Sequence, residues 1–132
     1  PNLYKVKKRY EIIFNNYAIG ILHPITTNLK NLKKETKIFL NSLVKSDLNY
    51  ILIYPNNDHG SDIILKEITR FKNYKKFKIF PSIRFEYYLT LLKHSKFIIG
   101  NWILRWTYHL FHFYIGKYAL YWTRSVIQLL YL

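Results

Sequence analysis

Between residues 50 and 101 the sequence alternates short apolar runs with segments of helical periodicity, and this alternation constrains the fold most strongly. The apolar runs are Tyr50–Tyr54, Phe77–Phe80 and Lys96–Ile99, and a proline or a glycine follows each of them. The segments between the runs carry apolar residues at the spacing of a helix face, and Ser61 stands at the expected N-cap of the first segment. These apolar residues are Ile64, Ile68 and Phe71 in the first segment, and Phe85, Tyr88, Leu89 and Leu92 in the second. Continuous apolar strands separated by helices are typical of a parallel sheet that is covered on both faces.

The residues before this region add one more strand and one more helix. Tyr17–Leu22 is expected to form the first strand, and a helix is expected to run to about Lys45 after a candidate N-cap within 26–28. The basic run Lys5–Arg9 is expected to be a solvated approach to the domain. The predicted fold class is therefore α/β, with a Rossmann-like parallel sheet and three crossover helices. Ligands of such sheets bind beyond the carboxyl ends of the strands, so the residues directly after each apolar run are the candidates for a site.

Four segments at these strand ends share a characteristic order and spacing. They are Gly20–Thr27 (GILHPITT), Tyr54–Ser61 (YPNNDHGS), Phe80–Tyr87 (FPSIRFEY) and Phe97–Asn101 (FIIGN). Together they resemble successive motifs of the UDP-N-acetylglucosamine 2-epimerases, and most of all those of the hydrolysing type that feeds sialic acid synthesis. The resemblance implies that residues 1–101 are part of the carboxyl-terminal lobe of a two-lobed, glycosyltransferase-B-like enzyme.

The same resemblance implies that four residues contact the substrate. His23 matches the active-site histidine of the lobe, near the UDP phosphates and the sugar, where a near-neutral pKa suits a proton donor or a phosphate partner. Asn56 matches a UDP-binding position, and Ile83 matches a position that contacts the uracil ring through main-chain groups. Asn101 matches the start of the diphosphate loop. His23 is thus expected to be catalytic, and all four residues are expected to bind UDP.

Considered without the resemblance, these positions have simpler interpretations. A histidine at a strand end is often structural or merely exposed, Asn56 lies in ordinary turn chemistry, and Ile83 would be assigned to the core. The remaining histidines show no spacing with carboxylates that indicates a metal site. The sequence contains no cysteine, which excludes disulfides and thiolate ligands.

Residues 102–132 differ from the region before them and are left unassigned. This tail holds all three tryptophans and no acidic residue, charged residues and histidines interrupt every long apolar window, and no period continues the sheet. In the epimerases, Ser-Ser-x-Gly follows the Gly-Asn pair and opens a helix whose N-terminal amides bind the diphosphate, whereas Trp102 follows here. Codon degeneracy permits residues 102–107 to be written as TGG ATC CTC CGG TGG ACT, and this choice of codons, translated one base forward, encodes Gly-Ser-Ser-Gly-Gly. A frameshifted or mispredicted tail is therefore favoured over true divergence.

Charge and composition bear on the partners and on the compartment. The formal net charge of +14 raises nucleic acid as a partner. The lysines are scattered, however, and no zinc-finger spacing, RRM motif or P-loop accompanies them, so a solvated basic surface is favoured and no nucleic acid is expected. Nothing at the start resembles a signal peptide, and a cytoplasmic location is expected. Methionine is absent even at position 1, which is expected of an excised or incomplete piece.

These observations predict a fragment of an enzyme that converts UDP-N-acetylglucosamine to N-acetylmannosamine and UDP by elimination and hydration. The resemblance implies that this chemistry requires no cofactor and no metal. It also implies that the main catalytic carboxylates lie on the amino-terminal lobe, so the isolated chain is expected to be inactive. The expected partners are UDP-N-acetylglucosamine or UDP, the missing lobe and, in the intact enzyme, further copies in a homo-oligomer. The alternative is a non-catalytic basic α/β module that binds nucleic acid or a membrane surface.

Overall fold

Helices and strands alternate along the sequence. The computed structural model describes residues 1–24, 29–55 and 57–100, together with the backbone of residues 118–123 and 126–131. The helices are α1 (Leu3–Arg9), α2 (Leu29–Lys45), α3 (Ser61–Thr69) and α4 (Phe85–Lys93). The strands are β1 (Ala18–Ile21), β2 (Tyr50–Ile53), β3 (Phe77–Phe80), β4 (Ile98–Gly100), β5 (Tyr118–Thr123) and β6 (Val126–Tyr131).

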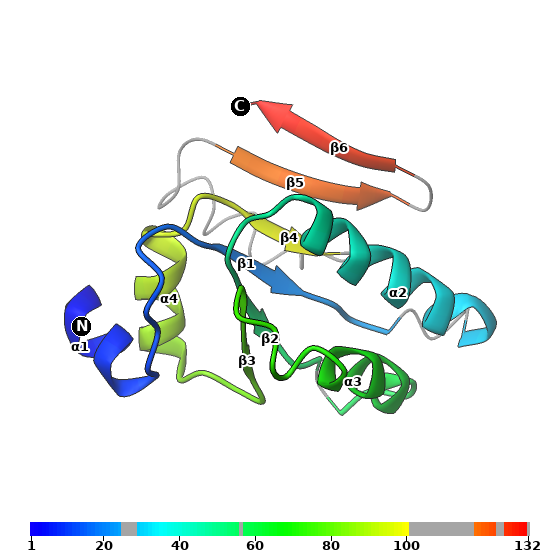
Figure 1. The fold of residues 1–132 in the computed structure, drawn as a ribbon, viewed down its shortest axis with the longest axis horizontal. Coiled ribbons are helices and arrows are strands. Elements are labelled where there is room, and N and C mark those ends of the chain that lie inside the picture. The colour runs from blue at the N-terminus through cyan, green and yellow to red at the C-terminus, as the bar shows by residue number, and fades with distance from the viewer. Residues whose placement is uncertain (25–28, 56, 101–117, 124–125, 132) are drawn as a thin grey trace.

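The strands form one sheet in the order β3-β2-β1-β4-β5-β6 (Figure 1). The pairs from β3 to β5 are parallel, and β6 is antiparallel to β5. The predicted parallel sheet is thus confirmed. Successive strands are added on one side of β1 as far as β3, and then on its other side from β4, so the winding reverses between β1 and β4. In open α/β sheets a reversal of this kind creates a crevice at the carboxyl ends of the two strands.

Both faces of strands β1–β4 are covered, and the side chains of these strands alternate between two apolar clusters. On one face, α2 and α3 cover a cluster that includes Ala18, Tyr50, Leu52, Phe77 and Ile99. On the other face, α1 and α4 cover a cluster that includes Ile19, Ile51, Ile98, Leu91 and Leu92. Consecutive residues of one strand, such as Ile98 and Ile99, enter opposite clusters, as the two-residue period of a strand requires. The continuous apolar runs in the sequence follow from this two-sided burial.

The amino-terminal basic run is helical, and the expectation of a solvated approach is wrong. The side-chain oxygen of Asn2 accepts a hydrogen bond from the N–H of Tyr4 at 2.7 Å and caps α1. Val6 is fully buried in the cluster that α1 shares with α4. The lysines of this run lie on the remaining faces of the helix. Because the charge of the segment comes from these lysines, charge alone predicts a solvated segment.

Two further corrections concern the starts of α3 and α4. Gly60 rather than Ser61 is the N-cap of α3, and Ser61 is its first helical residue. In α4 the buried residues are Leu91 and Leu92, whereas Phe85 is 62% exposed although it shares the apolar spacing. Phe85 belongs to the first turn of the helix and packs against neither apolar cluster.

Buried polar groups are few among the described residues. The hydroxyl of Tyr17 donates to the carbonyl of Leu91 at 2.8 Å, which ties the start of β1 to α4. Oε2 of Glu67, in α3, lies 3.4 Å from Nε of Arg70, but Oε1 is buried and has no partner among the described residues. Glu67 is 2% exposed, so one carboxylate oxygen is desolvated without compensation from that part of the protein.

The sequence pattern does not indicate the last two strands. Both are rich in aromatic and branched residues, which favour strands. Neither shows the alternation or the flanking turn residues from which a strand is inferred. The backbone pairing of β5 with β4 extends the parallel part of the sheet beyond residue 101.

Candidate functional site

The first candidate residue, His23, follows β1 at the carboxyl edge of the sheet. Leu22 and Pro24 on either side of it are buried, and the imidazole is half-buried. Burial lowers the pKa of His23 below its ordinary value of 6.5, and the nearby carboxylate of Asp58 acts in the opposite direction. The imidazole is therefore mostly neutral at pH 7, and an additional negative charge beside it would favour protonation.

The turn after β2 packs against the segment that carries His23. Gly60 has a φ of +96°, a conformation that residues with a side chain rarely adopt. A Cβ at Gly60 would lie 2.6 Å from Cδ2 of Leu29 and 3.2 Å from Cβ of Pro24. Glycine therefore allows the two strand-end segments to approach closely, and this packing accompanies the placement of Asp58 near His23.

The third strand ends at the turn that carries Ile83. The side chain of Ile83 packs against the apolar cluster under α4 and is half-buried. Its backbone N–H and carbonyl have no hydrogen-bond partner within the described part of the protein. The neighbouring N–H of Arg84, by contrast, donates to the hydroxyl of Tyr10 at 3.3 Å, and the carbonyl of Arg84 accepts from Tyr87 and Tyr88. The backbone groups of Ile83 are therefore among those that this turn leaves for a ligand.

The fourth strand ends beside the first. Gly100 is paired with Ile21, and a Cβ at Gly100 would overlap the carbonyl oxygen of Ile21. Asn101, which follows Gly100, and Asn56, which follows the second strand, lie outside the residues that the structure describes.

The described candidates share one edge of the sheet but not one point on it. His23 follows β1 and Gly100 ends β4, and these neighbouring strands form the crevice of the reversal. Ile83 follows β3, and β2 lies between β3 and β1. Because neighbouring strands are about 4.8 Å apart, the ends of β1 and β3 are separated by about 10 Å. An elongated ligand such as a nucleotide spans this distance, whereas a small ion does not.

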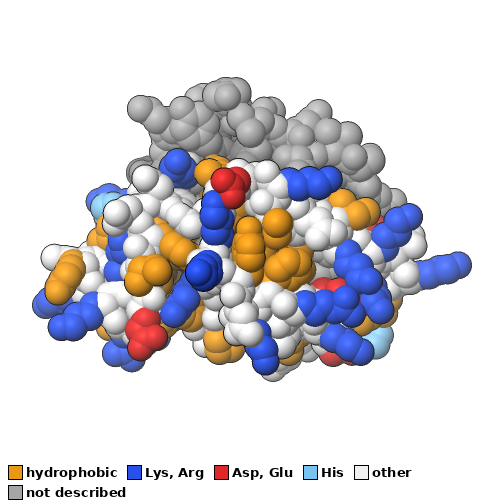
Figure 2. Space-filling model, viewed as in Figure 1, with side chains coloured by type: hydrophobic (Ala, Val, Ile, Leu, Met, Phe, Trp, Pro, Cys, Tyr) orange, Lys and Arg blue, Asp and Glu red, His pale blue; other side chains and the backbone are white. Residues whose placement is uncertain are grey.

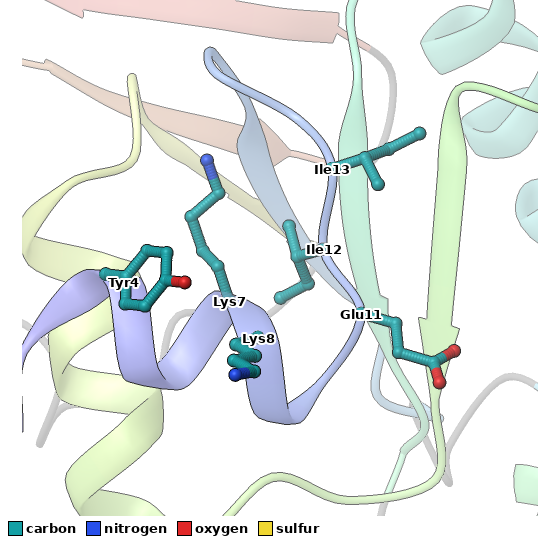
Figure 3. A pocket seen from close by; sticks show the side chains of 6 residues that line it. All are labelled: Tyr4, Lys7, Lys8, Glu11, Ile12 and Ile13. Carbon is teal, nitrogen blue, oxygen red and sulfur yellow. The ribbon is translucent and has the colours of Figure 1, made fainter.

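A pocket of about 400 Å³ lies elsewhere, beside α1 (Figure 3). Its lining residues are Tyr4, Lys7, Lys8, Glu11, Ile12 and Ile13. All of them come from α1 and the segment after it, and none follows a strand of the sheet. Across the described ranges, no group of three or more histidine or acidic residues is arranged to hold a metal ion.

Basic side chains are spread over the described surface rather than gathered at the strand ends. Figure 2 shows lysine and arginine side chains across the described part of the visible face, with few acidic ones among them. Lys30, Lys33, Lys34 and Lys37 are all exposed on α2, as the sequence predicts. No helix in the part of the protein that is described has the length and the apolar character needed to cross a membrane.

The strand order, the reversal between β1 and β4 and the two covered faces define a Rossmann-like α/β lobe. A sequence profile described as UDP-N-acetylglucosamine 2-epimerase matches residues 2–102. The protein belongs to this family.

Individual relatives agree with this assignment. The sequence is 45% identical over 101 residues to a UDP-N-acetylglucosamine 2-epimerase of Neisseria meningitidis serogroup B, and the match spans 76% of this protein and 26% of the relative. It is 32% identical over 103 residues to polysialic acid biosynthesis protein P7 of Escherichia coli, with the same two shares. It is also 34% identical over 82 residues to the GDP/UDP-N,N'-diacetylbacillosamine 2-epimerase (hydrolyzing) of Campylobacter jejuni, over 60% of this protein and 21% of the relative. The sequence thus spans about a quarter or less of the length of these relatives.

Two residues near the site do not stand out in the sequence. The sequence assigns Asp58 to an ordinary turn, although its position in the turn between β2 and α3 places it near His23. Tyr10 precedes β1 by several residues, and its contact with Arg84 joins residues 74 positions apart. A local pattern contains no signal for a contact of that separation.

Proposed function

We propose that this protein is the UDP-binding part of a hydrolysing epimerase, which converts UDP-N-acetylglucosamine to N-acetylmannosamine and UDP. The arrangement of His23, Gly100 and Ile83 along one edge of the sheet, in a member of this family, is the observation that carries the proposal. The hydrolysing type is favoured by the strand-end motifs and by the name of the Campylobacter relative.

In the proposed complex the uracil ring lies against the turn after β3. The imide edge of uracil offers one N–H donor flanked by two carbonyl acceptors. One backbone N–H and one backbone carbonyl, such as those of Ile83, complement this edge. Asn56 and Asn101 are proposed to contact the rest of UDP from the ends of the second and fourth strands.

His23 is proposed to act where the diphosphate leaves the sugar. Its imidazole is held mostly neutral by burial, and the charge that builds on the departing UDP would raise its pKa. His23 can then hydrogen-bond or protonate the leaving group, while elimination forms a glycal to which water adds. A contribution of about 10²–10⁴-fold to kcat is expected of a general acid or base. The other catalytic groups are expected on an amino-terminal lobe, and the intact enzyme is expected to be a homo-oligomer.

Calorimetric titration of the purified protein with UDP tests the proposed binding. We expect weak, saturable binding of UDP, and weaker binding of pyrophosphate, which lacks the base. Absence of any UDP binding at millimolar concentrations would contradict the proposal. A dissociation constant of about 1 mM corresponds to a binding free energy of only about −4 kcal/mol, so even a poor site binds UDP in this range. Without the other lobe, the protein should release no UDP from UDP-N-acetylglucosamine above the uncatalysed background.

The hydrolysing type is tested on the enzyme restored with its first lobe and with a Ser-Ser-x-Gly loop after Asn101. Free UDP and N-acetylmannosamine are the expected products. Formation of UDP-N-acetylmannosamine would assign the non-hydrolysing type instead. In the same enzyme, His23→Ala should lower kcat by the factor given above and leave the thermal unfolding midpoint nearly unchanged.

A further inference from the structure

The turn between β3 and α4 is held by a residue that precedes β1. The hydroxyl of Tyr10 accepts the hydrogen bond from the N–H of Arg84. The ring of Tyr10 meets Phe80 edge-on at a centroid distance of 5.3 Å and Tyr87 at 5.9 Å. Tyr10 therefore contacts the last residue of β3, the end of the turn and the first turn of α4.

The neighbours of Tyr10 strengthen this connection. The guanidinium of Arg9 lies 5.5 Å from the centre of the Tyr87 ring, and that of Arg84 lies 5.6 Å from it. The carboxylate of Glu11 lies 3.9 Å from Nζ of Lys78 in β3. Three consecutive residues, 9–11, thus contact β3, the turn or α4.

We propose that Tyr10 is a positioning residue for the nucleobase, fixing the turn at 81–84 so that the backbone groups of Ile83 meet the uracil edge. The inference rests on the proposed function and extends it to a residue far from the strand ends in the sequence. By engaging the N–H of Arg84, Tyr10 fixes the peptide unit directly after Ile83. Two hydrogen bonds to one base edge require that their donor and acceptor keep a fixed relative orientation, and a loose turn would not maintain it.

The variant Tyr10→Phe removes the hydroxyl and keeps the ring. Because Arg84 is exposed, water replaces the lost acceptor, so the thermal unfolding midpoint should change little. The affinity of the protein for UDP should fall by about twofold to tenfold, the range of one net hydrogen bond, and the affinity for pyrophosphate should not change. Tyr4→Phe is the matched control, because Tyr4 lies in the adjoining helix α1 and is 70% exposed. Unchanged UDP affinity in Tyr10→Phe, or an equal loss for pyrophosphate, would overturn the inference.

A double-mutant cycle with Arg84→Pro tests whether the hydrogen bond is responsible. Arg84 has a φ of −57°, which proline adopts, and proline removes the donor N–H. In the Arg84→Pro background, Tyr10→Phe should have no further effect on UDP affinity. If the effects of the two substitutions are fully additive, the hydrogen bond is not the cause and the inference fails.

Failure of the proposed function is distinguishable from failure of this inference. If the unaltered protein binds no UDP, the proposed function is wrong, and hydrogen exchange decides whether Tyr10 fixes the turn. The amide of Arg84 should then exchange at least about twofold faster in Tyr10→Phe than in Tyr4→Phe. Equal exchange in the two variants would show that Tyr10 does not fix the turn.

Discussion

Gly100 at the end of β4 lies so close to the carbonyl oxygen of Ile21 at the end of β1 that no side chain fits between them. The obstructing atom belongs to the backbone of a central strand and cannot move aside as a flexible side chain would. Gly100→Ala should therefore lower the free energy of unfolding by about 1–3 kcal/mol, the usual cost of overpacking. Urea denaturation measures the change, with Asn41→Ala on the exposed face of α2 as the control. Equal stability of the two variants would show that the strand ends can separate without cost.

Burial of His23 should make the stability of the protein depend on pH. The pKa of His23 is lower in the folded state than in the unfolded state, so between the two values the unfolded state binds more protons. The contribution of neutral His23 to the free energy of unfolding is therefore fully present above about pH 6.5. It is lost as the pH falls from that value through the lower pKa of the folded state. Between pH 7 and pH 5, the unaltered protein should lose more thermal stability than His23→Gln does. His59 and His94 are present in both proteins and cancel in the comparison. Parallel pH profiles would contradict the prediction.

Glu67 should be replaceable by an apolar residue with a gain in stability. One oxygen of its buried carboxylate has no partner among the described residues, and the other oxygen meets an arginine that is itself more than half exposed. Glu67→Met has a similar shape and removes the desolvated charge, so the free energy of unfolding should rise by about 1–4 kcal/mol. Glu86→Met, which alters an exposed ion pair on α4, should change it by less than about 1 kcal/mol. A loss of stability in Glu67→Met would indicate that the carboxylate has a strong partner.

The gene that encodes this protein should contain the missing diphosphate loop in another reading frame. The family profile matches residues 2–102 and stops where the strand-end motifs stop. We propose that residues 102–132 are out of frame, and that one of the other frames after the Asn101 codon encodes Ser-Ser-x-Gly. Sequencing the genomic DNA through this point decides the matter. If no other frame contains the loop, the tail is a true divergence of this protein.

The sequence predicts β1–β4 and α2–α4 well, because burial on two faces produces a continuous apolar run for each strand. It predicts α1 poorly. Four of the five residues in Lys5–Arg9 are basic and only Val6 is buried, so the segment has no apolar periodicity from which a helix could be inferred. The exposure of Phe85 is not predictable either. Helical periodicity shows which residues share one face of α4, but it does not show which of them another part of the protein covers.

The candidate site is only partly predictable in the same way. His23 is indicated by its place after a strand and by the family resemblance, whereas Ile83 is indicated by the resemblance alone. The topology brings the ends of the strands to one edge. The effect of Asp58 on His23 joins residues that follow two different strands, and the contact of Tyr10 with Arg84 spans 74 residues. Both require the folded protein, because neither follows from local spacing.

The outermost position of β3 has a consequence for the behaviour of the protein in concentrated solution. An edge strand presents unpaired backbone groups to which a strand of another molecule can attach, and edge-to-edge growth of this kind leads to aggregates. Here Lys78 occupies the strand and Pro81 directly follows it. Attachment of a foreign strand would bury the ammonium group of Lys78 and disturb its ion pair with Glu11, and proline offers no N–H to prolong the ladder. This margin of the sheet is thereby protected against polymerisation, and its resistance depends on the charge at Lys78.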